Sequence, residues 1–103
     1  MLRGFKAELF RAMAHPMRIR LLDALRDGEM SVGQLQAVLD AEQSPVSQHL
    51  AALRSQNLVI ARRDGTSIRY QIADPDIFTL LDIARDIYER QLARNQSMLN
   101  DSR

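Results

Sequence analysis

The sequence contains no cysteine and no tryptophan, and it has few aromatic residues, glycines or prolines. Without cysteine the chain forms no disulfide, has no thiol for catalysis or redox sensing, and cannot build a zinc or iron–sulfur site that needs thiolates. No apolar run approaches the ~18 residues of a membrane-spanning helix, and residues 1–6 lack the apolar core of a signal peptide. We therefore expect a cytoplasmic protein without a membrane partner.

The 103 residues, 46% of them hydrophobic and 26% charged, have the composition of one globular domain. So small a domain buries only about 60–65% of its unfolded surface, so dimerisation would add considerably to burial. The net charge is only +1, but residues 44–73 hold four arginines against one aspartate. Arginine presents a planar fork of donors that suits phosphate and guanine, so this segment is a candidate for binding a polyanion.

Residues 5–14 and 16–28 show the apolar spacing of two helices. Pro16 suits the first position of the second helix, because its φ is already set and it has no amide hydrogen to satisfy. Gly28 follows the last apolar residues of this helix, where glycine commonly ends helices.

Two short helices are predicted next, with a tight connection between them. Ser31 and Gln34 have the spacing of a capping box at the start of the first. Ser44 is the predicted N-cap of the second, with Pro45 at its first helical position. Since the second helix opens with polar, uncharged residues, the pair predicts a helix-turn-helix.

The hydrophobic period then changes from about 3.6 to 2. Two alternating runs, residues 58–63 and 67–72, flank Asp64-Gly65, a strong signal for a two-residue hairpin turn. Arg62 and Arg69 then lie together on the face opposite the apolar side chains. A hairpin that follows a helix-turn-helix is a wing.

A last helix is predicted from about Asp74 to Arg94, starting with acidic residues that favour a helix N-terminus. Its apolar stripe is long for so small a domain, so we expect part of it to pack against a second chain. One domain then spans residues 1–94, with a flexible tail at 95–103. The predicted dimer interface comprises Phe5, Leu9, Ile77, Leu80, Leu81, Ala84, Ile87 and Tyr88.

Three stretches in this order carry a family resemblance. Residues 14–22 (AHPMRIRLL), 44–53 (SPVSQHLAAL) and 62–70 resemble the second helix, the recognition helix and the wing of the ArsR/SmtB family of bacterial repressors. The resemblance covers about residues 5–94. It implies a mainly α fold with a small β-hairpin, the winged helix-turn-helix, that dimerises through its first and last helices. It also implies a homodimeric repressor that binds an inverted-repeat operator in double-stranded DNA.

In such a fold the first turn of the recognition helix enters the major groove, where polar side chains reach base edges. The predicted groove contacts are Gln43, Ser44, Ser47, Gln48 and His49. A glutamine bidentate to adenine is the clearest source of discrimination, at about 1–3 kcal/mol. The predicted contacts to phosphate or the minor groove are Arg54, Arg62, Arg63 and Arg69. Alternatively, Ser44 is only a cap and His49 only a packed helix residue.

Metal-sensing members of that family use two kinds of site, and neither set of ligands is present here. The Cys-x-Cys pair of the third helix corresponds to Ser31 and Gly33. The site across the paired last helices corresponds to Asp74, Asp76, Ile87 and Arg90. Since an apolar side chain and a cation replace half of those ligands, we predict no cofactor and no standard metal site.

Alternative functions stay open at this point. One is a repressor that responds to nickel or zinc through a nonstandard nitrogen and oxygen site, with His15 or the carboxylates of the last helix as ligands. Another is a winged-helix module that binds an unknown partner protein and not DNA. The base-reading polar residues and the basic wing argue against this module. An enzyme is not predicted, because the sequence has no cysteine, no phosphate-binding glycine loop and no placed Ser-His-acid trio.

Overall fold

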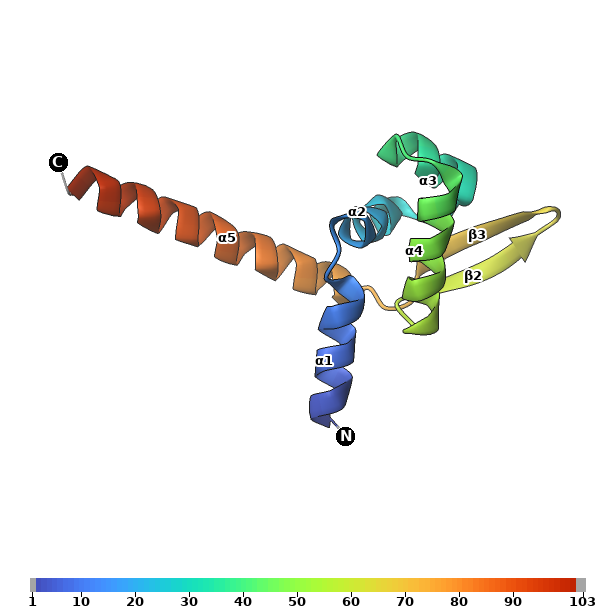
Figure 1. Cartoon of the computed structure of the whole chain (residues 1–103), viewed down its shortest axis with the longest axis horizontal. Coiled ribbons are helices and arrows are strands. Elements are labelled where there is room, and N and C mark those ends of the chain that lie inside the picture. Colours follow the sequence, from blue (N-terminus) through green and yellow to red (C-terminus); the bar gives the residue numbers. More distant parts are fainter. Residues whose placement is uncertain (1, 102–103) are drawn as a thin grey trace.

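The computed structural model describes residues 2–101, which form five α-helices, one 3₁₀ turn and three strands (Figure 1). In chain order they are α1 (Leu2–Met13), α2 (Pro16–Ala24), η1 (Leu25–Asp27), β1 (Met30–Ser31), α3 (Val32–Leu39), α4 (Gln43–Ser55), β2 (Val59–Asp64), β3 (Ser67–Ile72) and α5 (Asp76–Asp101). The predicted sequence of four helices, a hairpin and a last helix is confirmed. Strand β1 was not predicted, because it has only two residues and exists only through its pairing with β3.

Local signals set the starts of α2 and α3. Pro16 is the first residue of α2, as predicted, and the His15 side chain caps this helix by accepting a hydrogen bond from the Met17 backbone N–H. The capping box at α3 is confirmed. The Gln34 amide N–H donates to Ser31 Oγ over 3.2 Å, while the Ser31 N–H donates to Gln34 Oε1 over 2.9 Å.

The predicted start of α4 was wrong. The helix begins at Gln43, its N-cap is Glu42, and no side chain caps it, so Ser44 is not the N-cap. Pro45 is the third helical residue. Its missing N–H lies within the first turn, where amides have no intrahelical acceptor, so the helix tolerates proline there as well as at the first position.

The three strands form one antiparallel sheet in the order β1-β3-β2. Asp64 pairs with Ser67, so the two-residue turn is Gly65-Thr66, one residue later than the predicted Asp64-Gly65. Only the first turn residue has a positive φ (63° at Gly65), which is the requirement of a type II′ turn. The shift moves each cross-strand partner by two residues, so every side chain keeps its predicted face. Arg62 and Arg69 are directly opposite each other on the solvated face.

The core lies between α2, α3 and the inner side of α4. Its fully buried side chains are Leu21, Leu22, Leu25, Leu35, Val46, Leu50 and Leu53. The core face of the sheet adds Val59, with Tyr70 and Ile72 half-buried beside it. Helix α4 packs against this core with one stripe of side chains, which fixes the helix in place. Its opposite side is exposed to solvent.

Helix α5 runs away from the rest of the molecule and gives it an extent of 62 Å along its longest axis (Figure 1). Every residue from Asp82 to Asn100 is exposed. The helix continues to Asp101, so its predicted end near Arg94 was too early. Among residues 2–101, no helix combines the length and the apolar character needed to span a membrane.

Candidate nucleic-acid interface

The outward side of α4 carries the predicted groove residues. Gln43, Ser44 and Gln48 are exposed, and Ser47 is half-buried. Ser44 and Gln48 are four residues apart, so they lie on one line along the helix. Within the described chain, the side chains of Gln43, Ser44, Ser47 and Gln48 make no hydrogen bond to protein. Their donors and acceptors are therefore directed to solvent, as base edges in a major groove would require.

His49 lies on the flank of α4 and contacts α2. Its ring centroid is 4.2 Å from that of His15, and its Nδ1 accepts a hydrogen bond of 3.1 Å from Arg18 Nε. Arg18 also donates to the Ala12 carbonyl oxygen, 3.1 Å away. Burial, His15 and Arg18, in that order of size, lower the pKa of His49 below its ordinary value. These contacts support the alternative in which His49 is a packed helix residue, and its contact with a base stays a prediction.

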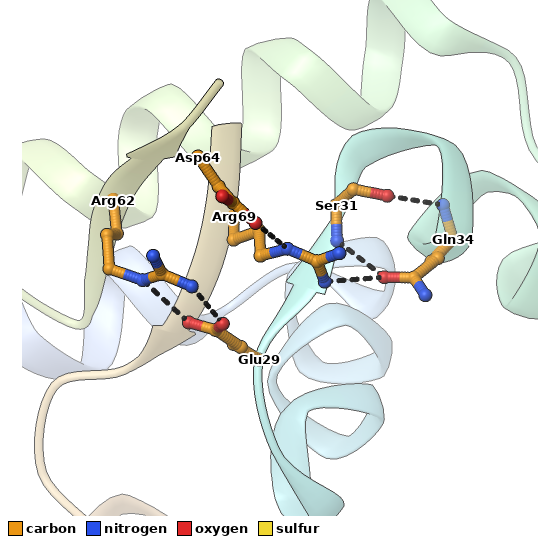
Figure 2. Close-up of polar contacts among 6 residues, drawn as sticks. All are labelled: Glu29, Ser31, Gln34, Arg62, Asp64 and Arg69. Atoms are coloured by element: carbon orange, nitrogen blue, oxygen red, sulfur yellow. Dashed lines mark hydrogen bonds and ion pairs between the residues drawn. The ribbon is translucent and has the colours of Figure 1, made fainter. Parts of the chain in front are cut away.

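The four predicted phosphate ligands divide into two pairs. Arg54 and Arg63 are exposed and have no ion-pair partner within residues 2–101. Arg62 donates both Nε and Nη2 to the Glu29 carboxylate, with the Nε bond at 3.2 Å (Figure 2). Arg69 Nε donates to Asp64 Oδ2 over 3.1 Å, and its Nη1 donates to Gln34 Oε1 over 3.5 Å.

The wing consists of β2, β3 and the turn between them. The ion pairs change the electrostatics that the sequence predicts for it. The hydrogen bonds from Arg62 lower the pKa of Glu29, so this carboxylate is charged at neutral pH. Arg62 and Arg69 are then neutralised by Glu29 and Asp64. Of the arginines in residues 44–73, Arg54 and Arg63 alone carry unpaired charge in the described structure.

Sequence reasoning did not find three contributors to this surface. Arg18 holds His49, and Glu29 and Gln34 hold the two wing arginines. The sequence has no signal for the first two contacts, because their partners are more than 30 residues away along the chain. Gln34 was predicted, but only for its capping role.

The predicted dimer residues are exposed or half-buried, with one exception. Ile77 is buried in the core of its own chain, only 6% exposed, and Leu81 packs half-buried against that core. Phe5, Leu9 and Leu80 help to line a groove of about 660 Å³ between α1, the loop after α4 and the start of α5. The remaining three, farther along α5, are exposed: Ala84, Ile87 and Tyr88.

No group of three or more histidine, aspartate or glutamate side chains that could hold a metal ion is found in residues 2–101. The two histidines are adjacent, but each uses Nδ1 to accept a hydrogen bond, from the Met17 N–H and from Arg18. A neutral imidazole in that state carries its proton on Nε2, which then has no lone pair for a metal. The nonstandard metal site at His15 therefore gains no support from the geometry.

Comparison with known proteins places this arrangement among bacterial regulators. The profile of the arsR family of bacterial regulatory proteins matches residues 15–61. The HTH-type transcriptional regulator Rv0081 of Mycobacterium tuberculosis is 44% identical over 99 residues, which cover 95% of this chain and 87% of that relative. The transcriptional activator HlyU of Vibrio cholerae is 35% identical over 80 residues, or 78% of this chain and 74% of HlyU.

Solved structures agree with these sequence matches. The crystal structure of Rv0081 superposes with a TM-score of 0.80 at 45% identity, covering 91% of this chain and 95% of that one. The homodimeric winged helix-turn-helix DNA-binding domain of Mb0332 from Mycobacterium bovis, solved by NMR, has a TM-score of 0.80 at 31% identity, covering 90% of this chain and 86% of the fragment.

Proposed function

Because the chain belongs to the arsR family of bacterial transcriptional regulators, we propose that it acts as a homodimeric, sequence-specific repressor that binds an inverted-repeat operator. A single domain of residues 1–94 binds DNA and dimerises, and beyond it α5 continues to Asp101 in place of the predicted flexible tail. The protein acts in the cytoplasm, where its DNA target lies.

The observation that carries this proposal is the open polar side of α4. Gln43, Ser44 and Gln48 project from a helix whose other side is fixed by fully buried leucine and valine side chains. A rigid helix with free amide and hydroxyl groups suits insertion into a major groove. Gln48 is the residue that we assign to base discrimination, with Gln43, Ser44, Ser47 and His49 around it.

The arginines supply the contacts that fix the register on DNA. Arg54 and Arg63 are free to bind phosphate as they stand. Arg62 and Arg69 are held by Glu29 and Asp64, so either one can bind phosphate only through the guanidinium N–H groups that these contacts leave free, or by exchanging its carboxylate partner.

Dimerisation is supported by the exposed apolar surface of α1 and α5. Phe5, Ile83, Ile87 and Leu92 are each more than two-fifths exposed. A long helix without tertiary packing is only marginally stable in water, so a second chain that covers α5 would stabilise it. Two copies related by a two-fold axis present two α4 helices, which suits an inverted repeat. Sedimentation of the purified protein at micromolar concentration is expected to show a dimer.

Fluorescence anisotropy tests the function directly. The protein is titrated into a labelled duplex from its own promoter and into a random duplex of the same length, each at several salt concentrations. We expect tighter binding to the promoter duplex at every salt, with both affinities falling as salt rises. Equal affinity for the two duplexes at all salts rules out the proposed function and favours a protein-interaction module.

Repression is the sign of regulation that we propose, and a promoter–reporter fusion tests it. Deletion of the gene should raise reporter expression. A fall in reporter expression would instead indicate activation, which is the activity in the name of the HlyU relative. For release from DNA we propose an effector or partner protein that needs no thiolate ligand, because the chain has no cysteine. Calorimetric titration with nickel, zinc, cobalt and copper separates metal effectors from the others.

A further inference from the structure

The solvated face of the sheet places two positive charges side by side. Arg62 on β2 and Arg69 on β3 are direct cross-strand partners. Like charges in this position destabilise a strand pair. Two carboxylates on this face, Glu29 and Asp64, offset that repulsion.

Glu29 supplies one of them from outside the hairpin. It immediately precedes β1, the edge strand that pairs only with β3, and its side chain crosses β3 to reach Arg62 on β2 (Figure 2). Both carboxylate oxygens accept from the guanidinium, at Nε and at Nη2. A bidentate pair fixes direction as well as distance, so it restrains the angle of β2 relative to β1.

Arg69 makes the second link between the wing and the helix-turn-helix. Besides Asp64 it reaches Gln34 Oε1, the same oxygen that accepts from the Ser31 amide in the capping box of α3. The outer face of the wing is thus tied to β1 by Glu29 and to the start of α3 by Arg69. Arg63, whose side chain is on the other face, takes part in neither link.

We propose that Glu29 is a positioning residue, which holds Arg62 so that the wing keeps the angle at which Arg63 and α4 meet the same DNA duplex. Arg62 then serves the orientation of the wing and is not a phosphate ligand, while Arg63 is the phosphate ligand of the wing. The inference rests on the proposed DNA-binding function and assigns different roles to two neighbouring arginines.

Affinity and its salt dependence separate these roles. Glu29→Gln and Arg62→Gln are each expected to weaken binding to the promoter duplex about two- to five-fold, the range for an exposed pair of good geometry. The double variant should lose no more than either single one. Since neither variant removes a phosphate contact, the slope of log affinity against log salt should stay unchanged, whereas Arg63→Gln should reduce it by about 1.

A charge swap gives the decisive result. Combining Glu29→Arg with Arg62→Glu restores the ion pair in reverse, and we expect it to bind at least as tightly as Arg62→Gln. If Arg62 bound phosphate, the swap would place a carboxylate against DNA, bind more weakly than Arg62→Gln, and overturn the proposal. A reduced salt slope in Arg62→Gln, or tighter binding by Glu29→Gln, would also overturn it.

Hydrogen exchange tests the inference without DNA and so separates its failure from that of the proposed function. Glu29→Gln and Arg62→Gln should speed amide exchange in residues 59–72 and leave α4 unchanged, while Arg63→Gln should change neither. Unchanged exchange in the wing would overturn the positioning role, whatever the protein binds. Glu29→Gln keeps the size of the side chain, and thermal unfolding of this variant checks that its fold is intact.

Discussion

Helix α4 and the wing both belong to the proposed DNA-binding surface, but the rest of the chain holds them in different ways. Beneath its polar side, α4 buries Val46, Leu50 and Leu53 completely. The wing is buried only at its base, around Val59, and Ile68 near its turn is 40% exposed. Its outer face is held by ion pairs between partly exposed groups.

The difference has a consequence for recognition. Buried apolar side chains fix α4 with several kcal/mol each, whereas an exposed ion pair contributes about 0.2–1 kcal/mol and is screened by salt. The surface that we propose to read bases is therefore rigid before DNA arrives. The orientation of the wing is set by surface ion pairs, so a single charge substitution or a change in salt concentration can shift it.

The largest effect is expected from the core beneath α4. Leu50→Ala should reduce the free energy of unfolding by about 2–5 kcal/mol, because it leaves a cavity where packing is complete. The same type of change in the wing, Ile68→Ala, should cost less, about 1 kcal/mol, because Ile68 is already 40% exposed and its truncation leaves no closed cavity. Urea denaturation of both variants measures the contrast. Equal losses would show that the wing is part of the core.

The next largest effect separates a contact to a base from a contact to phosphate. Gln48→Ala should remove about 1–3 kcal/mol of preference at one operator position and leave binding to random DNA nearly unchanged. Arg54→Gln, the matched change at a proposed phosphate contact on the same helix, should weaken binding to both duplexes alike and lower the salt slope by about 1. Anisotropy with operators that carry single base-pair changes measures both. A uniform loss in Gln48→Ala would assign that residue to the backbone.

A smaller effect is expected at the turn of the wing. Gly65 has a φ of 63°, so Gly65→Ala should cost about 1–2 kcal/mol through backbone strain, although an added Cβ meets no atom within 4 Å. Gly33→Ala, inside α3, is the control. Its Cβ would meet only Ser31 Oγ at 4.0 Å, and alanine is the better helix former, so this change should stabilise. Thermal unfolding in the same buffer compares the two glycine variants.

The elements that sequence reasoning placed correctly are those with local causes. The capping box of Ser31 and Gln34 and the start of α2 at Pro16 depend on neighbours within three residues. The start of α4 failed although its signals were local, because both Ser44 and Glu42 are polar and Pro45 is tolerated throughout the first turn. In the structure the Val46 N–H donates to the Glu42 carbonyl oxygen, and this first helical hydrogen bond makes Glu42 the N-cap.

The contacts that shape the candidate site could not be predicted from the sequence pattern, because they join residues far apart along the chain. The pair Glu29–Arg62 needs the order β1-β3-β2, and the contact of His15 with His49 needs the packing of α2 on α4. Alternation along β2 and β3 predicted which face each arginine occupies, and this was correct despite the shifted turn. The partners on that face come from residues whose spacing carries no signal.

The smallest effect is a difference in how the two regions respond to acid. In the folded chain the pKa of His49 lies below its ordinary value of 6.5, mainly because of burial and then because of His15 and Arg18. The unfolded chain therefore binds more protons below about pH 6.5, and stability falls as the pH drops through that value and levels off below the folded pKa. The pKa of Glu29 is also lowered, from 4.5, by Arg62. The stability that the wing pair contributes is therefore present above about pH 4.5 and is lost only as the pH falls farther.

Thermal unfolding measured between pH 7.5 and 5.5 checks this difference. Lowering the pH over this range should destabilise the wild type more than His49→Gln, which has no imidazole to titrate at this position. Glu29→Gln should follow the wild type. Equal pH dependence in the wild type and His49→Gln would show that the link between α2 and α4 does not respond to acid, and the contrast between the two regions would then lie in packing alone.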